Sequence, residues 1–190
     1  MYSLYIDTHD KNVVIILFKD GKVLDMKTLS STNKHSQITL PTIREVLDEQ
    51  RLDIHDLGEI IVVNGPGSFT GERIAVTIGK TIAYALEIPI KVIDSLTVSA
   101  INVKGDKTIA IEDKSGAYVA SFDKNNRIVD DIRYLSNSVY NEYKKNNKVI
   151  VDVDIDYNKV YEYINKFIQS DSPHNVKPLY VKGITGVNDK

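Results

Sequence analysis

The 190-residue sequence contains no cysteine. Disulfide bonds and thiolate metal sites are therefore excluded, and a reducing cytoplasm is compatible with such a chain. Long apolar runs are also missing, since the longest, such as residues 13–18, are far too short to span a bilayer. The first ten residues carry neither a basic start nor a small-residue cleavage site. We therefore expect a cytoplasmic protein with no secretory signal and no membrane partner.

An excess of basic charge is absent as well. The chain has 24 Lys and Arg residues against 26 Asp and Glu residues, and its net charge is −2. Binding the phosphate backbone of a nucleic acid requires a basic protein surface, because the binding is driven by the release of counterions. We therefore expect no nucleic-acid binding by this chain alone. The four histidines are never three or four residues apart, so we predict no metal and no cofactor.

The first hundred residues alternate between strand-like and helix-like segments. Asp20-Gly21 is a strong hairpin signal and predicts a meander of three antiparallel strands. The start of the helix that follows is open, because Pro41 would kink a helix that began near His35. We expect strands at 2–7, 12–18, 22–29, 58–64 and 89–93, and helices at 38–50 and 70–86.

The second half repeats this order loosely. Strands are expected at 108–113, 117–122, 127–135 and 148–154, a short helix or loop at 136–148, and a helix at 157–170. Two copies of β-β-β-α-β-α predict an α/β, two-lobed fold of the ribonuclease-H-like class that includes actin, Hsp70 and sugar kinases. The predicted lobes are residues 1–102 and a smaller second lobe, 103–190. A dinucleotide-binding sheet, the rival, would begin with βαβ rather than a meander.

The C-terminal tail forms no regular element in this prediction. From Ser170 onward it is rich in Pro, Asn, Asp and Gly, so most of it should be extended or frayed. The short run 178–181 is the part that could dock.

A glycine-rich turn, GPGSFTG, leads from a buried strand into the long helix. A Walker A loop would need Lys and Ser or Thr after the last glycine, where this chain has Glu72 and Arg73. A dinucleotide fingerprint would need a shorter glycine spacing, although Asp94 lies where a ribose-binding acid would be. Glu72 also places negative charge where a pyrophosphate would bind.

Two structural interpretations of the turn remain. The glycines can supply backbone freedom while Ser68 or Thr70 caps the helix, or the turn can position the helix for a partner. We assign a structural role to Gly65, Pro66, Gly67, Ser68, Phe69, Thr70 and Gly71.

The helix after the turn is apolar over roughly 200° of its circumference, about twice the stripe that a surface helix needs. It must therefore be covered on two sides. One side is the sheet, and the other is either the helix at 38–50 or a second protein. Small side chains along Val76, Gly79 and Ala83 would let another helix approach closely. Composition alone favours the intramolecular explanation.

Asp7 and Thr8 follow the first strand. In the sugar-kinase class an Asp at this place can hold Mg²⁺ and phosphate, which makes Asp7 and Thr8 candidate nucleotide-cleft residues. The alternative is a turn-forming Asp that accepts backbone N–H bonds.

Several motifs in order resemble the TsaB (YeaZ) family. GPGSFTG is followed by R-I-x-V-x-x-x-K, and it is preceded by an Ile-Asp-Thr start at 6–8 and by His-Ser-Gln at 35–37. Residues 178–182 are similar to the family's C-terminal PxYhR segment. The likeness is strong over residues 1–100 and thin between 105 and 175. One departure is Glu72, since the family usually has Leu there.

The resemblance implies an actin-like, two-lobed protein that is a required accessory subunit and carries no catalytic residue. Its partner would be a TsaD-like transferase, which moves threonylcarbamoyl from threonylcarbamoyl-AMP to the tRNA adenosine next to the anticodon. A TsaE-like ATPase would join the complex, and tRNA would be bound through the complex only. The isolated chain would form a homodimer through the same surface.

The family contact uses the two helices of the first lobe, and Glu72 would meet a cation of the partner. The partner-binding residues implied are Ile43, Val46, Leu47, Glu72, Arg73, Val76, Gly79, Lys80 and Ala83. Two alternatives are a small-molecule kinase or ATPase using the inter-lobe cleft and, less favoured, a nicotinamide-dependent oxidoreductase.

Overall fold

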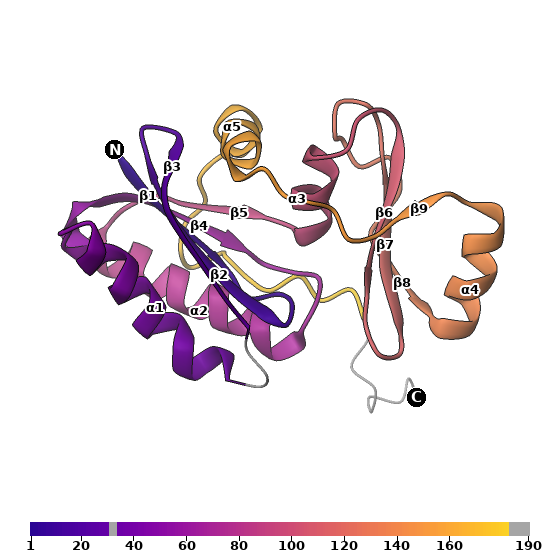
Figure 1. Ribbon diagram of the computed structural model, residues 1–190, viewed down its shortest axis with the longest axis horizontal. Coiled ribbons are helices and arrows are strands. Elements are labelled where there is room, and N and C mark those ends of the chain that lie inside the picture. The colour runs from indigo at the N-terminus through magenta and orange to yellow at the C-terminus, as the bar shows by residue number, and fades with distance from the viewer. Residues whose placement is uncertain (31–33, 183–190) are drawn as a thin grey trace.

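The computed structural model describes residues 1–30 and 34–182, and within them it contains two β-sheets (Figure 1). The first sheet has the strand order β3-β2-β1-β4-β5. Its strands are β1 (Tyr2–Asp7), β2 (Asn12–Lys19), β3 (Lys22–Ser30), β4 (Leu57–Val63) and β5 (Ile90–Ile93).

The first three strands form the predicted antiparallel meander, and β4 and β5 continue the sheet in parallel with β1. The turn between β2 and β3 is built on Asp20 and Gly21, whose φ angles are 50° and 85°. Positive φ at both central residues matches the right-handed twist of a tight hairpin, so the hairpin signal in the sequence is confirmed.

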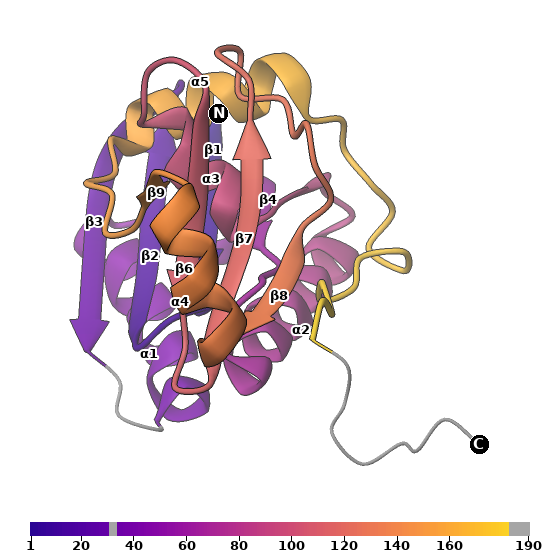
Figure 2. The ribbon, with the colours of Figure 1, turned by 90° about the vertical axis from the view of Figure 1, so that its right-hand side faces the viewer.

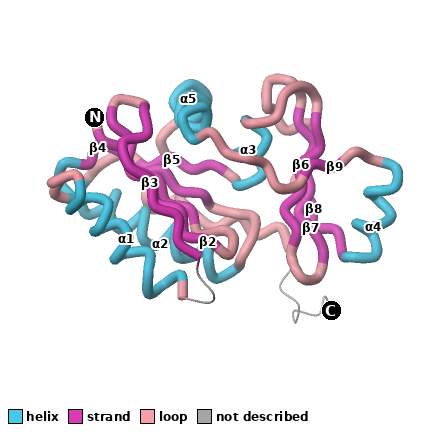
Figure 3. The backbone as a smooth tube through the Cα atoms, in the orientation of Figure 1, coloured by secondary structure: helices cyan, strands magenta, loops and turns pink. Residues whose placement is uncertain are grey.

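Helices cover both faces of the first sheet. The helices α1 (His35–Glu49) and α2 (Phe69–Leu86) lie side by side on one face, while α3 (Ser95–Ile101) and α5 (Tyr157–Phe167) lie on the other (Figure 3). A one-turn helix, η1 (Ile54–Asp56), precedes β4. Because both faces are covered, β4 is buried along nearly its whole length. This burial explains why its sequence shows no polar alternation.

The second sheet repeats the plan of the first with shorter strands. Its order is β8-β7-β6-β9, with β6, β7 and β8 antiparallel and β9 parallel to β6. The elements are β6 (Lys107–Glu112), β7 (Gly116–Phe122), β8 (Arg133–Ser136), α4 (Asn137–Asn146) and β9 (Val149–Ile150). The predicted tandem β-β-β-α-β-α fold is therefore confirmed, but the strands expected at 127–135 and 148–154 are shorter than predicted.

The helix α3 lies between the two sheets, whereas α5 lies over the first sheet (Figures 1 and 3). On α3, Val98 packs on the first sheet, whereas Leu96 and Ala100 pack on the second. On α5, Val160 and Ile164 join the core of the first sheet, although the helix belongs to the second half by sequence. The division of the chain into two lobes, residues 1–102 and 103–190, therefore stays a prediction.

The helix α1 begins at His35 in spite of Pro41. Pro41 lies inside the helix, and the hydroxyls of Thr39 and Thr42 donate to the carbonyls of His35 and Ile38, at 2.6 and 2.7 Å. The helix therefore starts three residues earlier than the range predicted from the apolar face.

Residues 171–182 follow a mostly extended path with one turn at 172–175, and we call this segment the C-terminal strap. It leaves α5, passes α2 and reaches the second sheet near β8 (Figure 2). Most of this segment was expected to be extended or frayed, but it is docked from Asp171 to Lys182. The rest of that tail lies outside the described residues. In the described part of the chain, no helix has the length and apolar character needed to cross a bilayer.

Candidate functional site

The glycines of the turn at 65–71 are required by close packing. A Cβ on Gly67 would collide with the carbonyl oxygen of His9, and a Cβ on Gly71 would collide with that of Thr8. Gly65 has a φ of 104°, a conformation that side chains disfavour. The turn is thus pressed against the end of β1, which explains the motif without any ligand.

The polar groups of the turn are paired within the chain. The N–H of Ser68 donates to the carbonyl of His9 at 2.6 Å. The Thr8 hydroxyl donates to the carbonyl of Gly71, and the Ser95 hydroxyl donates to that of Pro66, each at 2.6 Å. Ser68 is the N-cap of α2 and accepts from the Gly71 N–H at 3.3 Å. A phosphate would have to break these bonds to use the turn.

Glu72 lies inside the turn rather than at a subunit boundary. Glu72 is only 3% exposed, and its carboxyl group lies against Gly65, where an added Cβ would collide with it. Burial raises the pKa of Glu72 to about 7, against the opposing effects of the Gly67 N–H, His9 and Arg73. The expectation that Glu72 meets a cation of the partner is therefore wrong. The chain's own carboxyl group therefore occupies the inner side of the turn at Gly65.

Asp7 and Thr8 are committed to contacts inside the chain. The Asp7 carboxylate, 4% exposed, accepts from the His9 N–H at 3.0 Å and lies 2.6 Å from His9 Nδ1. Burial, the largest single effect, lowers the pKa of His9, but the charge and hydrogen bond of Asp7 together with the charges of Asp10 and Glu72 outweigh it, and the net pKa is raised. Thr8 is fully buried. These contacts support the turn-forming interpretation of Asp7.

A cleft between the two sheets opens next to Asp7. Its volume is 390 Å³, and its lining includes Asp10, Glu112 and Asp152. The lining carries these acids against one lysine, Lys11, and this excess of negative charge disfavours the phosphates of a nucleotide. Within residues 1–30 and 34–182, no group of three or more His, Asp or Glu side chains is arranged to hold a metal ion.

An apolar groove runs between α1 and α2, and we call it the α1–α2 groove. Its volume is 410 Å³. Leu40 from α1 is 54% exposed and Phe69 from α2 is 47% exposed, so two large apolar side chains face solvent here. The groove is lined by Ser36, Leu40, Phe69, Thr70, Arg73, Ile74, Thr77 and Ile78.

Most side chains assigned to partner binding face the protein's own core. Gly79 lies against β4, because a Cβ there would collide with Val62. The others that are buried in the core on this face of the first sheet are Ile43, Val46, Leu47, Val76 and Ala83. The small-residue stripe of α2 therefore lets the helix approach its own sheet, and the surface left to a partner is the adjoining α1–α2 groove.

The two cationic residues in that assignment lie at the surface of α2. The Arg73 guanidinium stacks over the Phe69 ring at 3.8 Å, and its Nε donates to the Tyr180 hydroxyl at 2.9 Å. Lys80 Nζ donates to the carbonyl of Val176 at 3.3 Å. The sequence-based assignment of partner-binding residues did not include Leu40, Ile74 and Ile78. It named residues 178–181 as a run that could dock but did not place Tyr180 beside Arg73. Exposure of Leu40 could have been inferred from the helical period, but nothing local in the sequence links Tyr180 to α2.

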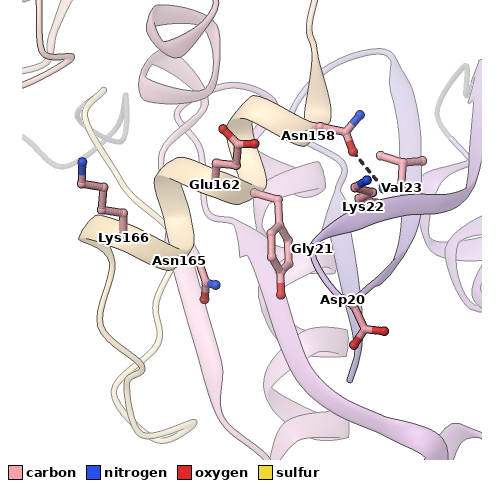
Figure 4. Close-up of a pocket in the computed structure, with 9 residues that line it drawn as sticks. Asp20, Gly21, Lys22, Val23, Asn158, Glu162, Asn165 and Lys166 are labelled. Carbon is pink, nitrogen blue, oxygen red and sulfur yellow. Dashed lines mark hydrogen bonds between the residues drawn. The ribbon is translucent and has the colours of Figure 1, made fainter.

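A second groove lies on the opposite face, between the β2–β3 turn and α5 (Figure 4). Its volume is 780 Å³, and its lining carries Asp20 and Glu162 as well as Lys22 and Lys166. The side-chain oxygen of Asn158 accepts from the Val23 N–H at 2.9 Å and fixes the hairpin to α5. Charges of both signs give this groove no preference for one kind of ligand.

Known proteins are similar to this chain mainly over the region that contains the glycine turn and the α1–α2 groove. The family model of TsaD, tRNA N6-adenosine threonylcarbamoyltransferase, matches residues 22–116, half of the chain. The Bacillus subtilis protein "tRNA threonylcarbamoyladenosine biosynthesis protein TsaB" is 36% identical over 102 residues, which are 54% of this chain and 44% of that protein. The chain belongs to the TsaB family.

The TsaB-family likeness extends to Escherichia coli, whose protein of the same name is 31% identical over 100 residues, 53% of this chain and 43% of that protein. The matches thus span less than half the length of these curated relatives. The solved structure "YeaZ from Pseudomonas aeruginosa" covers 94% of this chain and 99% of that chain, with a TM-score of 0.75 and 18% identity. At that identity the structure shows the shared TsaB-family fold.

Proposed function

We propose that this chain is a non-catalytic, accessory subunit in tRNA threonylcarbamoyladenosine synthesis, and that it binds a TsaD-like transferase through the α1–α2 groove. The observation that carries the proposal is the exposed pair Leu40 and Phe69 at the mouth of an apolar groove, on the two helices within the matched family region. Large apolar side chains gathered on a surface are typical of protein–protein contacts.

A non-catalytic role is supported by the paired state of the candidate chemical groups. Asp7 is engaged by His9 and Thr8 by Gly71, and Glu72 is buried. The transfer from threonylcarbamoyl-AMP to the adenosine next to the anticodon would take place on the TsaD-like subunit. Because the net charge of this chain is −2, tRNA would be bound through the complex rather than by this chain alone. A TsaE-like ATPase would join that complex in the cytoplasm.

The same groove would let the isolated chain form a homodimer. An apolar surface that lacks its partner gains free energy when a second copy covers it. Partner binding and self-association would then compete for one surface.

The proposal is tested by co-purification with the TsaD-like protein of the same genome, followed by a tRNA modification assay with and without this chain. The variant Leu40→Asp places a charge in the groove at an exposed position, so the fold should be retained. We expect it to lose binding and modification. The control is Lys166→Ala, an exposed change on α5 at the opposite groove. Normal binding by folded Leu40→Asp would show that the partner surface lies elsewhere.

A further inference from the structure

The C-terminal strap is anchored to the first sheet and its helices at several points. The N–H of Asp171 donates to the carbonyl of Ile90, and the N–H of Leu179 donates to that of Asn64, each at 2.8 Å. Val176 is buried in the core beside α2. These bonds fix residues 171–179 along the edge of the first sheet.

The far end of the strap is held by the second sheet. Lys182 Nζ lies 3.2 Å from Asp113 Oδ2, 2.6 Å from Ser115 Oγ and 3.0 Å from the Tyr134 hydroxyl. Val181 packs into the apolar cluster of that sheet. Lys182 therefore fixes the end of the strap to the second sheet, and the strap joins the two halves of the molecule (Figure 2).

Tyr180 lies between these two anchors and reaches the rim of the α1–α2 groove. Its hydroxyl accepts from Arg73, and its ring lies 5.6 Å from that of Phe69. The Tyr180 side chain is 50% exposed. Because Phe69 and Arg73 line the groove, Tyr180 extends the apolar surface beyond the two helices.

The chemistry of this rim indicates what it binds. Arg73 is held by two aromatic rings and a hydroxyl, and among the described residues no carboxylate lies within ion-pair distance of it. A planar guanidinium held in this way keeps N–H groups for a carboxylate of a partner. The rim therefore fits an apolar helix that presents an Asp or Glu side chain to Arg73.

We propose that the docking surface is a composite of the α1–α2 groove and the strap, in which Tyr180 contacts the TsaD-like partner and Lys182 holds Tyr180 in position from the second sheet. This inference rests on the function proposed above and adds a contact residue and a coupling between the lobes. A shift of the second lobe would move Lys182, and through it would alter the surface that the partner meets.

The test measures the dissociation constant between this chain and the TsaD-like protein of the same genome. We expect Tyr180→Ala to weaken binding about tenfold, as truncation of an aromatic interface residue commonly does. Tyr180→Phe should stay near the unmodified protein, because the ring remains over Arg73. Lys182→Ala should weaken binding about threefold and should lower the hydrogen-exchange protection of the Leu179 amide.

The matched control is Lys177→Ala, which changes an exposed side chain on the same strap and leaves the backbone carbonyl that Asn64 Nδ2 contacts. It should leave the affinity unchanged. If Leu40→Asp abolishes binding while Tyr180→Ala and Lys182→Ala do not weaken it, the composite surface is refuted and the groove stands. If Leu40→Asp also binds the TsaD-like protein normally, the α1–α2 groove is not the partner surface, and the proposed function is contradicted as well.

Discussion

The carboxyl group of Glu72 packs against Gly65, where an added Cβ would collide with it, so the glycine turn encloses an acid that belongs to the chain itself. Phosphate-binding turns leave their N–H groups open toward a ligand. Here the first turn of α2 places the Glu72 side chain against the glycine turn instead.

The stability of the protein should fall as the pH rises from about 5 to about 8. Glu72 has its pKa raised from 4.5 to about 7 by burial, so the folded state holds a proton that the unfolded state has released. The contribution of Glu72 to the free energy of unfolding is then greatest below pH 4.5, and it is lost as the pH rises to about 7. The raised pKa of His9 acts in the same direction, because its stabilisation is present below pH 6.5 and is lost above its folded pKa.

Glu72→Gln isolates this effect, because an amide has nearly the same shape as the carboxyl group but cannot ionise. We expect the variant to be more stable than the unmodified protein at pH 8 by about 2 kcal/mol and to differ little at pH 5. Urea denaturation across the pH range measures this difference. The control Glu162→Gln, at an exposed position on α5, should leave the profile unchanged. Equal effects of Glu72→Gln at both pH values would contradict the raised pKa.

Gly79→Ala should destabilise the fold by about 1–3 kcal/mol, because the added methyl group overpacks α2 against Val62 and Ile60 of β4. Thermal and urea denaturation measure the loss. Thr77→Ala lies on the exposed side of the same helix and should change the stability by less than about 0.5 kcal/mol. An unchanged melting temperature for Gly79→Ala would mean that the helix does not approach the sheet as closely as described.

ATP with Mg²⁺ should neither stabilise the isolated chain nor be hydrolysed by it. The inter-lobe cleft carries Asp10, Glu112 and Asp152, and Asp7 is occupied by His9. Differential scanning fluorimetry with and without nucleotide tests the first statement, and a phosphate-release assay tests the second. A rise in melting temperature that is lost in Asp7→Asn would restore the kinase or ATPase alternative.

Sequence patterns predicted the first sheet well because each strand there carries a local signal. The Asp20-Gly21 turn defines the hairpin, and the continuous apolar run of β4 reflects burial on both faces. In the second sheet, β9 is only Val149–Ile150, and most of the apolar run around it forms no ladder. The length of β9 depends on its pairing with β6, which lies far away in the sequence. The apolar run around β9 therefore could not by itself define where the strand begins and ends.

The candidate site was only partly accessible from sequence. The wide apolar arc of α2 was identified, but periodicity does not distinguish the side that faces the sheet from the side that faces a partner. Val76 and Ala83 proved to be core residues, whereas Leu40 and Phe69 proved to be exposed. Tyr180 reaches Arg73 across more than a hundred residues of chain, and no short-range pattern carries that information.

The position of α5 has a consequence for synthesis on the ribosome. Tyr5, Ile16 and Phe18 are covered by a helix that begins only at residue 157. The part of this face that α5 covers therefore stays open to water until nearly the whole chain has emerged, because α3 covers only the rest of it. The N-terminal half must wait for a helix of the second half before its core is closed.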